Sequence, residues 1–362
     1  MTSPEDIAAV VTRALEEAIR KLGIVNVLIA GRTGVGKSTL INAVFEGQLA
    51  DTGQGRPVTR STREITKKGI PLAIWDTRGL EMAAFRETIT ELVNLAISRS
   101  SESDAKRHIH VAWLCIHEDL RRVEDAEIEL HKALARHMPV IGVITKARAD
   151  QGFKSEVQRH LSDARNVVRV RALSEELDEG QVLSPMGLEK LVEATSEVIP
   201  ESFQRAFAAA QKVSLKRKKN VAHGIVASSA TAASAFGASP IPFSDAAVLV
   251  PIQIGMLAGI SSTFGLQLST AFLSTLLASA AGGTAATFAG RTIVSNLLKF
   301  IPGGGTIAGG AISASTAAAL TTTLGEVYIA TLVALFSNTG GEAPSADQVV
   351  RAFRKRLSAK ER

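Results

Sequence analysis

A glycine-rich stretch in the first tenth of the chain has the residue types and the spacing of a phosphate-binding loop. Residues Gly31–Thr39 read GRTGVGKST, which matches G-x-x-x-x-G-K-[ST] at every fixed position. Its glycines let successive backbone N–H groups turn toward a polyphosphate, because no Cβ stands in the way. The Lys37 ammonium would reach the β- and γ-phosphates as a catalytic charge, and the Ser38 hydroxyl would bind Mg²⁺. The loop predicts a nucleotide held by Gly31, Thr33, Gly34, Val35, Gly36, Lys37, Ser38 and Thr39.

A second pattern lies at the end of an apolar run. Residues 70–75 read IPLAIW and lead into DTRG at 76–79, which fits D-x-x-G. Alone this pattern is uninformative, but here it follows a phosphate loop and ends a predicted strand. We therefore expect Asp76 to hold Mg²⁺ through water and the Gly79 N–H to meet the γ-phosphate.

Strands and helices alternate along the first part of the chain, and they must position these residues. Continuous apolar runs predict strands at 25–30, 70–75, 109–116, 140–144 and 167–173. The remaining periodic segments predict helices at 38–45, 81–99, 123–137 and 186–199. This alternation implies a parallel sheet covered by helices on both faces, with ligands at the carboxyl ends of the strands. Asp76 and Lys146 both follow such ends.

Composition divides the chain into two parts. Residues 1 to about 219 are mixed and charge-rich, whereas residues 220–341 are crowded with Ala, Gly, Ser, Thr and Leu and nearly free of charge. The 362 residues suffice for two domains with a core each. The single cysteine, Cys115, lies in an apolar run, which rules out a disulfide framework and indicates a reducing compartment. The acidic start lacks the basic region of a signal peptide, so we expect the nucleotide domain to face the cytoplasm.

An amphipathic helix is predicted over residues 4–22. Ser3 is placed as its cap, Pro4 at its first position and Gly23 just after its end. Its apolar residues recur at helical spacing: Ile7, Val10, Val11, Ala14, Leu15, Ala18 and Leu22. We expect this face to pack on one part of the chain, with a membrane surface as the alternative.

These motifs together carry a family resemblance. The phosphate loop, the DTRG motif and Thr145-Lys146 resemble a GTP-binding domain of the Era/HSR1 type. The resemblance narrows to bacterial and fungal GTPases with a C-terminal DUF697 domain through residues 55–59, 75–81, 113–116, 238–246 and 250–253. The implied fold is an α/β P-loop G domain, with a mostly parallel sheet and helices on both faces, followed by an all-α, Ala/Gly-rich domain.

The resemblance also implies a function and its residues. It implies a GTPase that binds GTP and GDP with Mg²⁺. A switch threonine is implied in the loop 51–63, where we assign a catalytic role to Thr59 and keep Thr62 as the alternative. The metal ligands would be Ser38, Thr59 and Asp76. The base contacts would be Thr145, Lys146 and Ala172.

Three positions depart from the family pattern. The motif [NT]-K-x-D would place Asp where this chain has Arg148, and the missing carboxylate should weaken the preference for GTP over ATP. Asp150 could substitute, but it lies two residues after the motif position. Leu80 stands where Ras-like enzymes have a water-orienting Gln, so hydrolysis should be slow unless an activating protein, a second protomer or another residue helps. Relatives activated by potassium have Asn where this chain has Gly34, so no potassium dependence is expected.

The apolar part could enter a membrane or form a buried helical core. Residues 246–290 carry no ionisable side chain over 45 positions, and residues 300–325 form a second such run. Either is long enough for a span of about twenty residues, and the many glycines would let helices approach closely. Two observations argue against insertion. Both runs are rich in Ser and Thr, and this part of the chain has few of the aromatic residues that mark a membrane interface: it has no Trp, and Tyr328 is its single Tyr. Basic clusters flank this part on both sides, so we favour membrane association with both ends in the cytoplasm and an even number of spans.

Asp245 is an isolated carboxylate directly before the uncharged segment 246–290. After the prolines at 240 and 242 it has the position of a helix N-cap. The alternative is a buried polar pair with Gln253.

The expected organisation has five parts: an N-terminal helix at 1–22, a G domain at 23–200, a basic connecting helix at 201–220, a DUF697-like domain at 221–341 and a basic tail helix at 342–362. The favoured function is a slow GTPase switch coupled to a membrane-associated helical domain. One alternative is a nucleotide-gated protein-binding module with negligible turnover. Another is an Era-like ribosome- or RNA-associated GTPase. The basic pI favours it, but the chain has no RNA-binding motif and no base-stacking aromatics beside the basic clusters.

Overall fold

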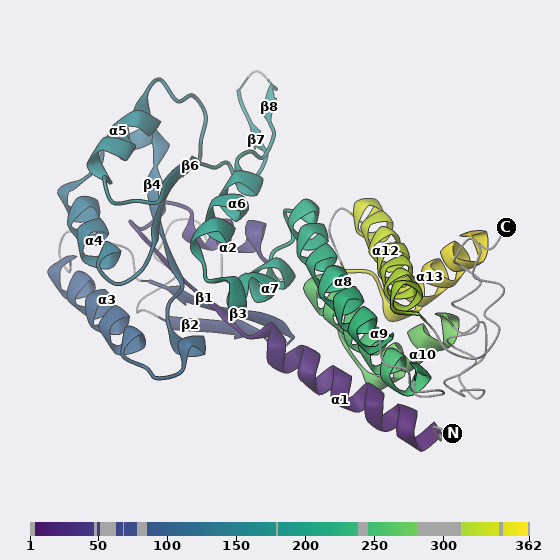
Figure 1. Cartoon of the computed structure of the whole chain (residues 1–362). Helices are drawn as coiled ribbons and strands as arrows, with labels where there is room; N and C mark the ends of the chain where they lie inside the picture. Colours follow the sequence, from purple (N-terminus) through teal and green to yellow (C-terminus); the bar gives the residue numbers. More distant parts are fainter. Residues whose placement is uncertain are drawn as a thin grey trace. The chain divides into compact units, whose positions relative to one another are not determined.

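The chain forms two compact units (Figure 1). The computed structural model describes residues 4–46, 49–50, 63–67, 69–77, 85–178, 180–237, 245–280, 313–339 and 343–360. The first unit, which we call the nucleotide unit, comprises Gly23–Ser214. The second, the helical unit, combines Met1–Leu22 with Leu215–Arg362. Each unit buries its own apolar side chains.

A six-stranded sheet in the order β2-β3-β1-β4-β5-β6 organises the nucleotide unit (Figure 1). Neighbouring strands run parallel in β1 (Val25–Gly31), β3 (Ile70–Asp76), β4 (Val111–His117), β5 (Val140–Thr145) and β6 (Asn166–Arg169). This confirms the mostly parallel sheet. The sixth strand, β2 (Arg63–Lys67), pairs antiparallel with β3 at the edge and was not expected. Its sequence REITK has one apolar residue, so the strand depends on its pairing with β3 and leaves little periodic signal.

Helices cover both faces of this sheet because its central strands are apolar on both faces. Along β1, Val27 and Ile29 point into one core, whereas Leu28 and Ala30 point into the other. The first core also holds residues of α2 (Lys37–Val44), α6 (Leu188–Val198) and α7 (Glu201–Ala210). The second holds residues of α3 (Phe85–Ser100), α4 (Asp125–Ala135) and α5 (Phe153–His160).

The expectation of one helix over residues 201–220 was wrong. The structure has α7, then a break, then α8 (Leu215–Gly237). Gln211 lies at the break, fully buried, and its main chain forms an isolated bridge with Phe45. Its side chain accepts a hydrogen bond from the Ser214 N–H at 2.7 Å and donates one to the Ser214 carbonyl at 2.9 Å. These bonds satisfy main-chain groups of Ser214 that a continuous helix would have paired. The boundary between the two units follows Ser214, so α7 belongs to the nucleotide unit.

In the part of the helical unit that the structure describes, the N-terminal helix and the C-terminal helices pack around one core (Figure 1). Its members besides α8 are α1 (Pro4–Leu22), α9 (Asp245–Thr263), α10 (Thr270–Ala280), α12 (Ala314–Asn338) and α13 (Ala346–Lys360). The buried face of α1 carries Val11, Ala14 and Ala18 and packs on α9 and α10. Inside the core, Ser261 and the fully buried Tyr328 share a hydrogen bond of 2.7 Å.

One helix among the described residues, α12, is long and apolar enough to cross a membrane. Of its most apolar 18-residue window, 56% is buried inside the structure. Core helices of water-soluble proteins meet the same criterion, so this finding is weak evidence for a span. Much of the expected apolar segment, residues 281–312, lies outside the described residues, and the predicted even number of spans stays a prediction.

The expected cap at the start of α9 also stays a prediction. The helix begins at Asp245, whose side chain lies outside the described residues. Gln253 is fully buried, and neither its amide nitrogen nor its amide oxygen has a hydrogen-bond partner among the described residues.

Candidate nucleotide-binding site

The predicted phosphate loop joins β1 to α2 and depends on a glycine at its first position. Gly31 has φ 148°, and a Cβ there would lie 2.4 Å from the Cys115 carbonyl oxygen on the neighbouring strand β4. Gly36 has φ 98° and immediately precedes α2, whose first helical hydrogen bond runs from the Leu40 N–H to the Gly36 carbonyl at 2.9 Å. The N-terminal N–H groups of α2 therefore open toward the loop, which is the arrangement that favours an anion.

Lys37 folds back onto this loop. Its Nζ donates hydrogen bonds to the Gly31 carbonyl at 2.9 Å and to the Arg32 carbonyl at 3.2 Å. Burial lowers the pKa of Lys37, and the negative charge of Asp76 partly restores it. The ammonium thus lies inside the loop, close enough to Asp76 to feel its charge.

Asp76 occupies the carboxyl end of β3, as expected. It is fully buried and lies beside Ile29 of β1 in the sheet register. The next residue, Thr77, is tied to the same strand by a hydrogen bond from its N–H to the Ile29 carbonyl at 3.2 Å. A buried carboxylate and the partly buried Ser38 hydroxyl provide oxygen donors of the kind that Mg²⁺ prefers. The other predicted groups of this region, Thr59, Thr62, Gly79 and Leu80, lie outside the described residues.

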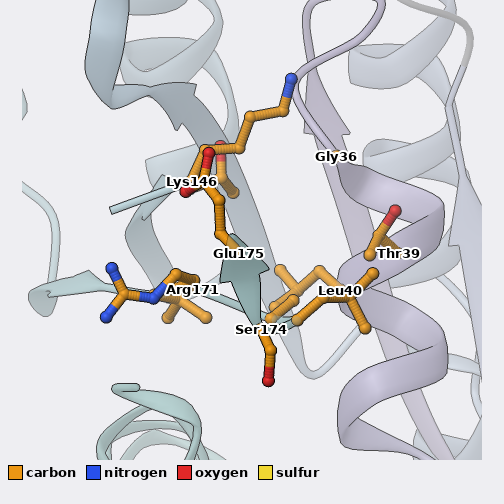
Figure 2. A pocket seen from close by; sticks show the side chains of 11 residues that line it. Gly36, Thr39, Leu40, Lys146, Arg171, Ser174 and Glu175 are labelled. Atoms are coloured by element: carbon orange, nitrogen blue, oxygen red, sulfur yellow. The ribbon is translucent and has the colours of Figure 1, made fainter. Parts of the chain in front are cut away.

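The predicted base contacts line one pocket together with the end of the phosphate loop (Figure 2). The pocket measures about 170 Å³. One side carries residues of the loop and α2, and the other carries residues at and after the ends of β5 and β6. Its lining residues are Gly36, Thr39, Leu40, Thr145, Lys146, Val170, Arg171, Ala172, Leu173, Ser174 and Glu175. Thr145, Lys146 and Ala172, which are far apart in the sequence, are thus brought to the same place.

Residues 146–150, which form the loop after β5, are fixed by a buried carboxylate that sequence reasoning missed. Glu118, directly after β4, is fully buried and accepts hydrogen bonds of 2.5 Å from the Arg148 N–H and from the Arg169 Nε. Burial alone would raise the pKa of Glu118, but these two hydrogen bonds hold it below its usual value. Arg121 also donates to the Ala149 carbonyl and, at 2.6 Å, to the Asp150 carbonyl. A charged residue that ends a buried strand was the signal that could have drawn attention to Glu118.

Arg148, at the position where the family pattern has Asp, does not line the pocket. Its guanidinium forms an ion pair with Glu175, the first residue of the short strand β7 (Glu175–Glu176). The Arg148 Nε lies 3.0 Å and 3.1 Å from the two carboxylate oxygens. Strand β7 pairs with β8 (Val182–Leu183) in a small hairpin that was not expected, because two-residue strands leave no periodic signal.

Comparison with known proteins decides the family of both parts. Residues 26–146 match the family model described as 50S ribosome-binding GTPase, and residues 203–358 match DUF697, a domain of unknown function. The chain carries a GTPase domain followed by a DUF697 domain. The resemblance inferred from the motifs is thereby confirmed, and so is the fold class. The GTPase family hydrolyses GTP.

Curated relatives of the chain include proteins named tRNA modification GTPase MnmE. The protein of Verminephrobacter eiseniae (strain EF01-2) is 37% identical over 145 residues, which cover 37% of this chain and 26% of that protein. The protein of Paracidovorax citrulli (strain AAC00-1) is 32% identical over 172 residues, which cover 44% and 33%. The chain thus spans about a quarter to a third of the length of these curated relatives.

The solved structures to which the chain is similar share a smaller fraction of identical residues with it. Era of Aquifex aeolicus bound to GDP·AlF4⁻ is 22% identical, with 58% of this chain and 67% of that chain covered and a TM-score of 0.35. Toc33 of Arabidopsis thaliana in complex with Mg²⁺ and GMPPNP is 19% identical, with 55% and 93% covered and a TM-score of 0.35.

Proposed function

We propose that the nucleotide unit is a switch that binds GTP and GDP with Mg²⁺ and hydrolyses GTP slowly on its own. The observation that supports this most is the shared pocket of the phosphate loop and the predicted base contacts. A phosphate loop by itself would accept any nucleoside triphosphate. A pocket that continues from the loop to Thr145, Lys146 and Ala172 also offers a place for the base.

The phosphates would replace the contacts that Lys37 now makes. Its ammonium donates to two main-chain carbonyls of the loop, which are neutral acceptors. Transfer of these donors to the β- and γ-phosphates exchanges neutral acceptors for charged ones, and hydrogen bonds between charged groups are the stronger kind. The N–H groups of residues 31–39 and the N-terminus of α2 would hold the remaining phosphate oxygens.

Ser38 and Asp76 would hold the magnesium ion, Ser38 directly and Asp76 through water, with Thr59 as the ligand from the switch loop. The bound ion would supply positive charge to the β- and γ-phosphate oxygens. The burial of Asp76 suits this role, because a buried carboxylate gains most from a nearby cation. Slow hydrolysis is inferred from Leu80, since an apolar side chain cannot orient the attacking water. An activating protein or a second copy of the chain would then supply the missing group.

Single-turnover phosphate release from the full chain tests the hydrolytic part. We expect slow release with GTP and Mg²⁺, loss of release in Lys37→Ala, and unchanged release in Lys132→Ala, which removes an exposed lysine of the same unit. GTP binding without any phosphate release would contradict hydrolysis. It would favour the alternative, a nucleotide-gated module that docks a protein partner.

The helical unit would couple the nucleotide state to a membrane surface. The C-terminal helix α13 supports this because it buries Val349, Phe353 and Leu357 and exposes a basic face with Arg351, Arg354, Lys355 and Arg356. Exposed basic side chains attract anionic lipids. Flotation of the full chain with anionic vesicles, loaded with GDP or with a non-hydrolysable GTP analogue, tests the coupling. We expect binding that differs between the two nucleotides and weakens in high salt, whereas no flotation in either state would refute it.

A further inference from the structure

The departure at Arg148 leaves the proposed base site without its usual acid. A guanine base presents two neighbouring donors, N1–H and the N2 amino group, and a single carboxylate can accept from both. The acceptor must lie in the pocket beside Lys146, where the base would be. In the described part of the chain, acidic side chains lie at or near residues 146–150: Glu118, Asp119, Asp150 and Glu175.

Glu118, Asp119 and Asp150 lie near those residues but serve elsewhere. Both carboxylate oxygens of the buried Glu118 already accept hydrogen bonds. One oxygen of Asp150, Oδ1, accepts from the Lys154 N–H at 2.8 Å, in the first turn of α5, and also lies 3.8 Å from the Arg169 Nε. Asp119 lies 3.9 Å from Arg148 and does not line the pocket. Asp150, considered from the sequence as a substitute, is thus engaged in fixing the loop.

Glu175 is the acidic residue that lines the pocket within the described part of the chain. Its side chain is 29% exposed, so it is open to a ligand, and it lies on the same side of the pocket as Lys146, across from Thr39 and Leu40 (Figure 2). The hydrogen bond from Arg148 lowers the pKa of Glu175, and the charges of Arg148, Arg171 and Lys146 lower it further. The side chain is therefore an anion at neutral pH.

The ion pair with Arg148 leaves Glu175 able to accept more hydrogen bonds. Arg148 approaches mainly through Oε1, which receives both Nε and Nη2, whereas Oε2 receives only the shared Nε–H at 3.1 Å. A carboxylate offers about four acceptor sites and Arg148 brings two N–H donors, so about two sites remain for the two guanine donors. The pair also fixes the orientation of a glutamate side chain that would otherwise be free to rotate.

We propose that Glu175 is the carboxylate that recognises the guanine N1–H and N2 amino group, and that Arg148 is its positioning residue. The acid is delivered from strand β7, on the loop that follows Ala172, instead of from the loop that follows Lys146. This inference rests on the proposed GTP binding and names its base-reading residue. It would give a chain with Arg148 a means of preferring guanine.

The assignment is tested by two changes made together: Glu175→Gln in the protein, and xanthosine triphosphate in place of GTP as the ligand. Glu175→Gln keeps the size of the side chain and removes its charge. We expect the affinity for GTP to fall about tenfold to a hundredfold, since hydrogen bonds to a charged group are lost. Xanthosine triphosphate carries a C2 carbonyl in place of the amino group, and an amide can donate to that oxygen. Its affinity should therefore rise in Glu175→Gln, a gain that an unfolded or loosened protein cannot show.

Matched variants separate this assignment from its alternatives. Glu176→Gln changes the next carboxylate of the same hairpin, which does not line the pocket, and should bind GTP like the wild type. Arg148→Ala should weaken GTP binding without a gain for xanthosine triphosphate. If the wild type binds GTP and Glu175→Gln prefers GTP over xanthosine triphosphate as strongly as the wild type does, the assignment is overturned and the proposed function stays intact. A wild type that binds no GTP would overturn both.

Discussion

Glu118→Gln is the substitution whose effect on the nucleotide unit can be worked out most directly. The Glu118 carboxylate is fully buried and accepts from Arg169 and from the Arg148 main chain. An amide keeps one acceptor oxygen but turns an NH₂ group toward the other donor, and it leaves Arg169 without its closest counter-charge. Loss of one partner of a buried ion pair costs about 3–5 kcal/mol. Because Arg169 is 17% exposed and Asp150 lies 3.8 Å away, we expect a cost below this range, about 2–3 kcal/mol.

Tryptophan fluorescence measures this change in the full chain. Both tryptophans, Trp75 and Trp113, belong to the nucleotide unit, so thermal unfolding followed by their emission reports on that unit. A loss of this size should lower the unfolding midpoint by about 4–12 °C, at about 2–4 °C per kcal/mol for a unit of this size. The control Glu176→Gln removes an exposed charge and should shift the midpoint by no more than about 2 °C. Equal midpoints in the two variants would refute the assigned role of Glu118.

Three further predictions follow from particular side chains. The pKa of Glu118 is lowered in the folded unit, so the stability that it contributes is present at neutral pH and is lost as the pH falls through the folded pKa. When the pH is lowered below about 4.5, the unfolding temperature should therefore decrease, and it should decrease less steeply in Glu118→Gln; equal slopes would contradict this. Gly31→Ala should destabilise the nucleotide unit by about 2 kcal/mol or more in urea, because the new Cβ would meet the Cys115 carbonyl; an unchanged midpoint would contradict the loop geometry. Gly325→Ala should lower the free energy of unfolding of the helical unit, measured by calorimetry, by about 1–3 kcal/mol, because its Cβ would lie 2.5 Å from the Val226 Cγ2. The new Cβ of Gly255→Ala would meet nothing within 4 Å, so this variant should raise that free energy by up to about 1 kcal/mol. The reverse order of the two variants would contradict the helix packing.

The parts of the fold that local sequence determines were predictable. Strand β1, the phosphate loop and α2 lie within one residue of their expected bounds, because an apolar run, a set of glycines and a helix start are all local signals. The meeting of Thr145, Lys146 and Ala172 at one pocket also followed from the sequence, since carboxyl ends of parallel strands share one edge. The contacts of these residues with a nucleotide stay predictions.

The parts that depend on distant partners were not predictable. The break between α7 and α8 arises because Gln211 pairs with Phe45 and Ser214, and no periodic pattern reveals the first of these contacts. Glu118 follows β4 and Arg169 ends β6, two strands that β5 separates in the sheet. The residues are 51 positions apart in the sequence, and their pairing needs the sheet. The hairpin that carries Glu175 is stabilised by pairing between two very short strands, which propensity does not indicate.

Calorimetric titration of the full chain with GTP and with ATP, both with Mg²⁺, tests the central claim most directly. We predict that GTP binds more tightly than ATP and that Lys37→Ala weakens GTP binding at least about tenfold, because charged hydrogen bonds to the phosphates are lost. ATP binding as tight as GTP binding, or an unchanged GTP affinity in Lys37→Ala, would contradict it.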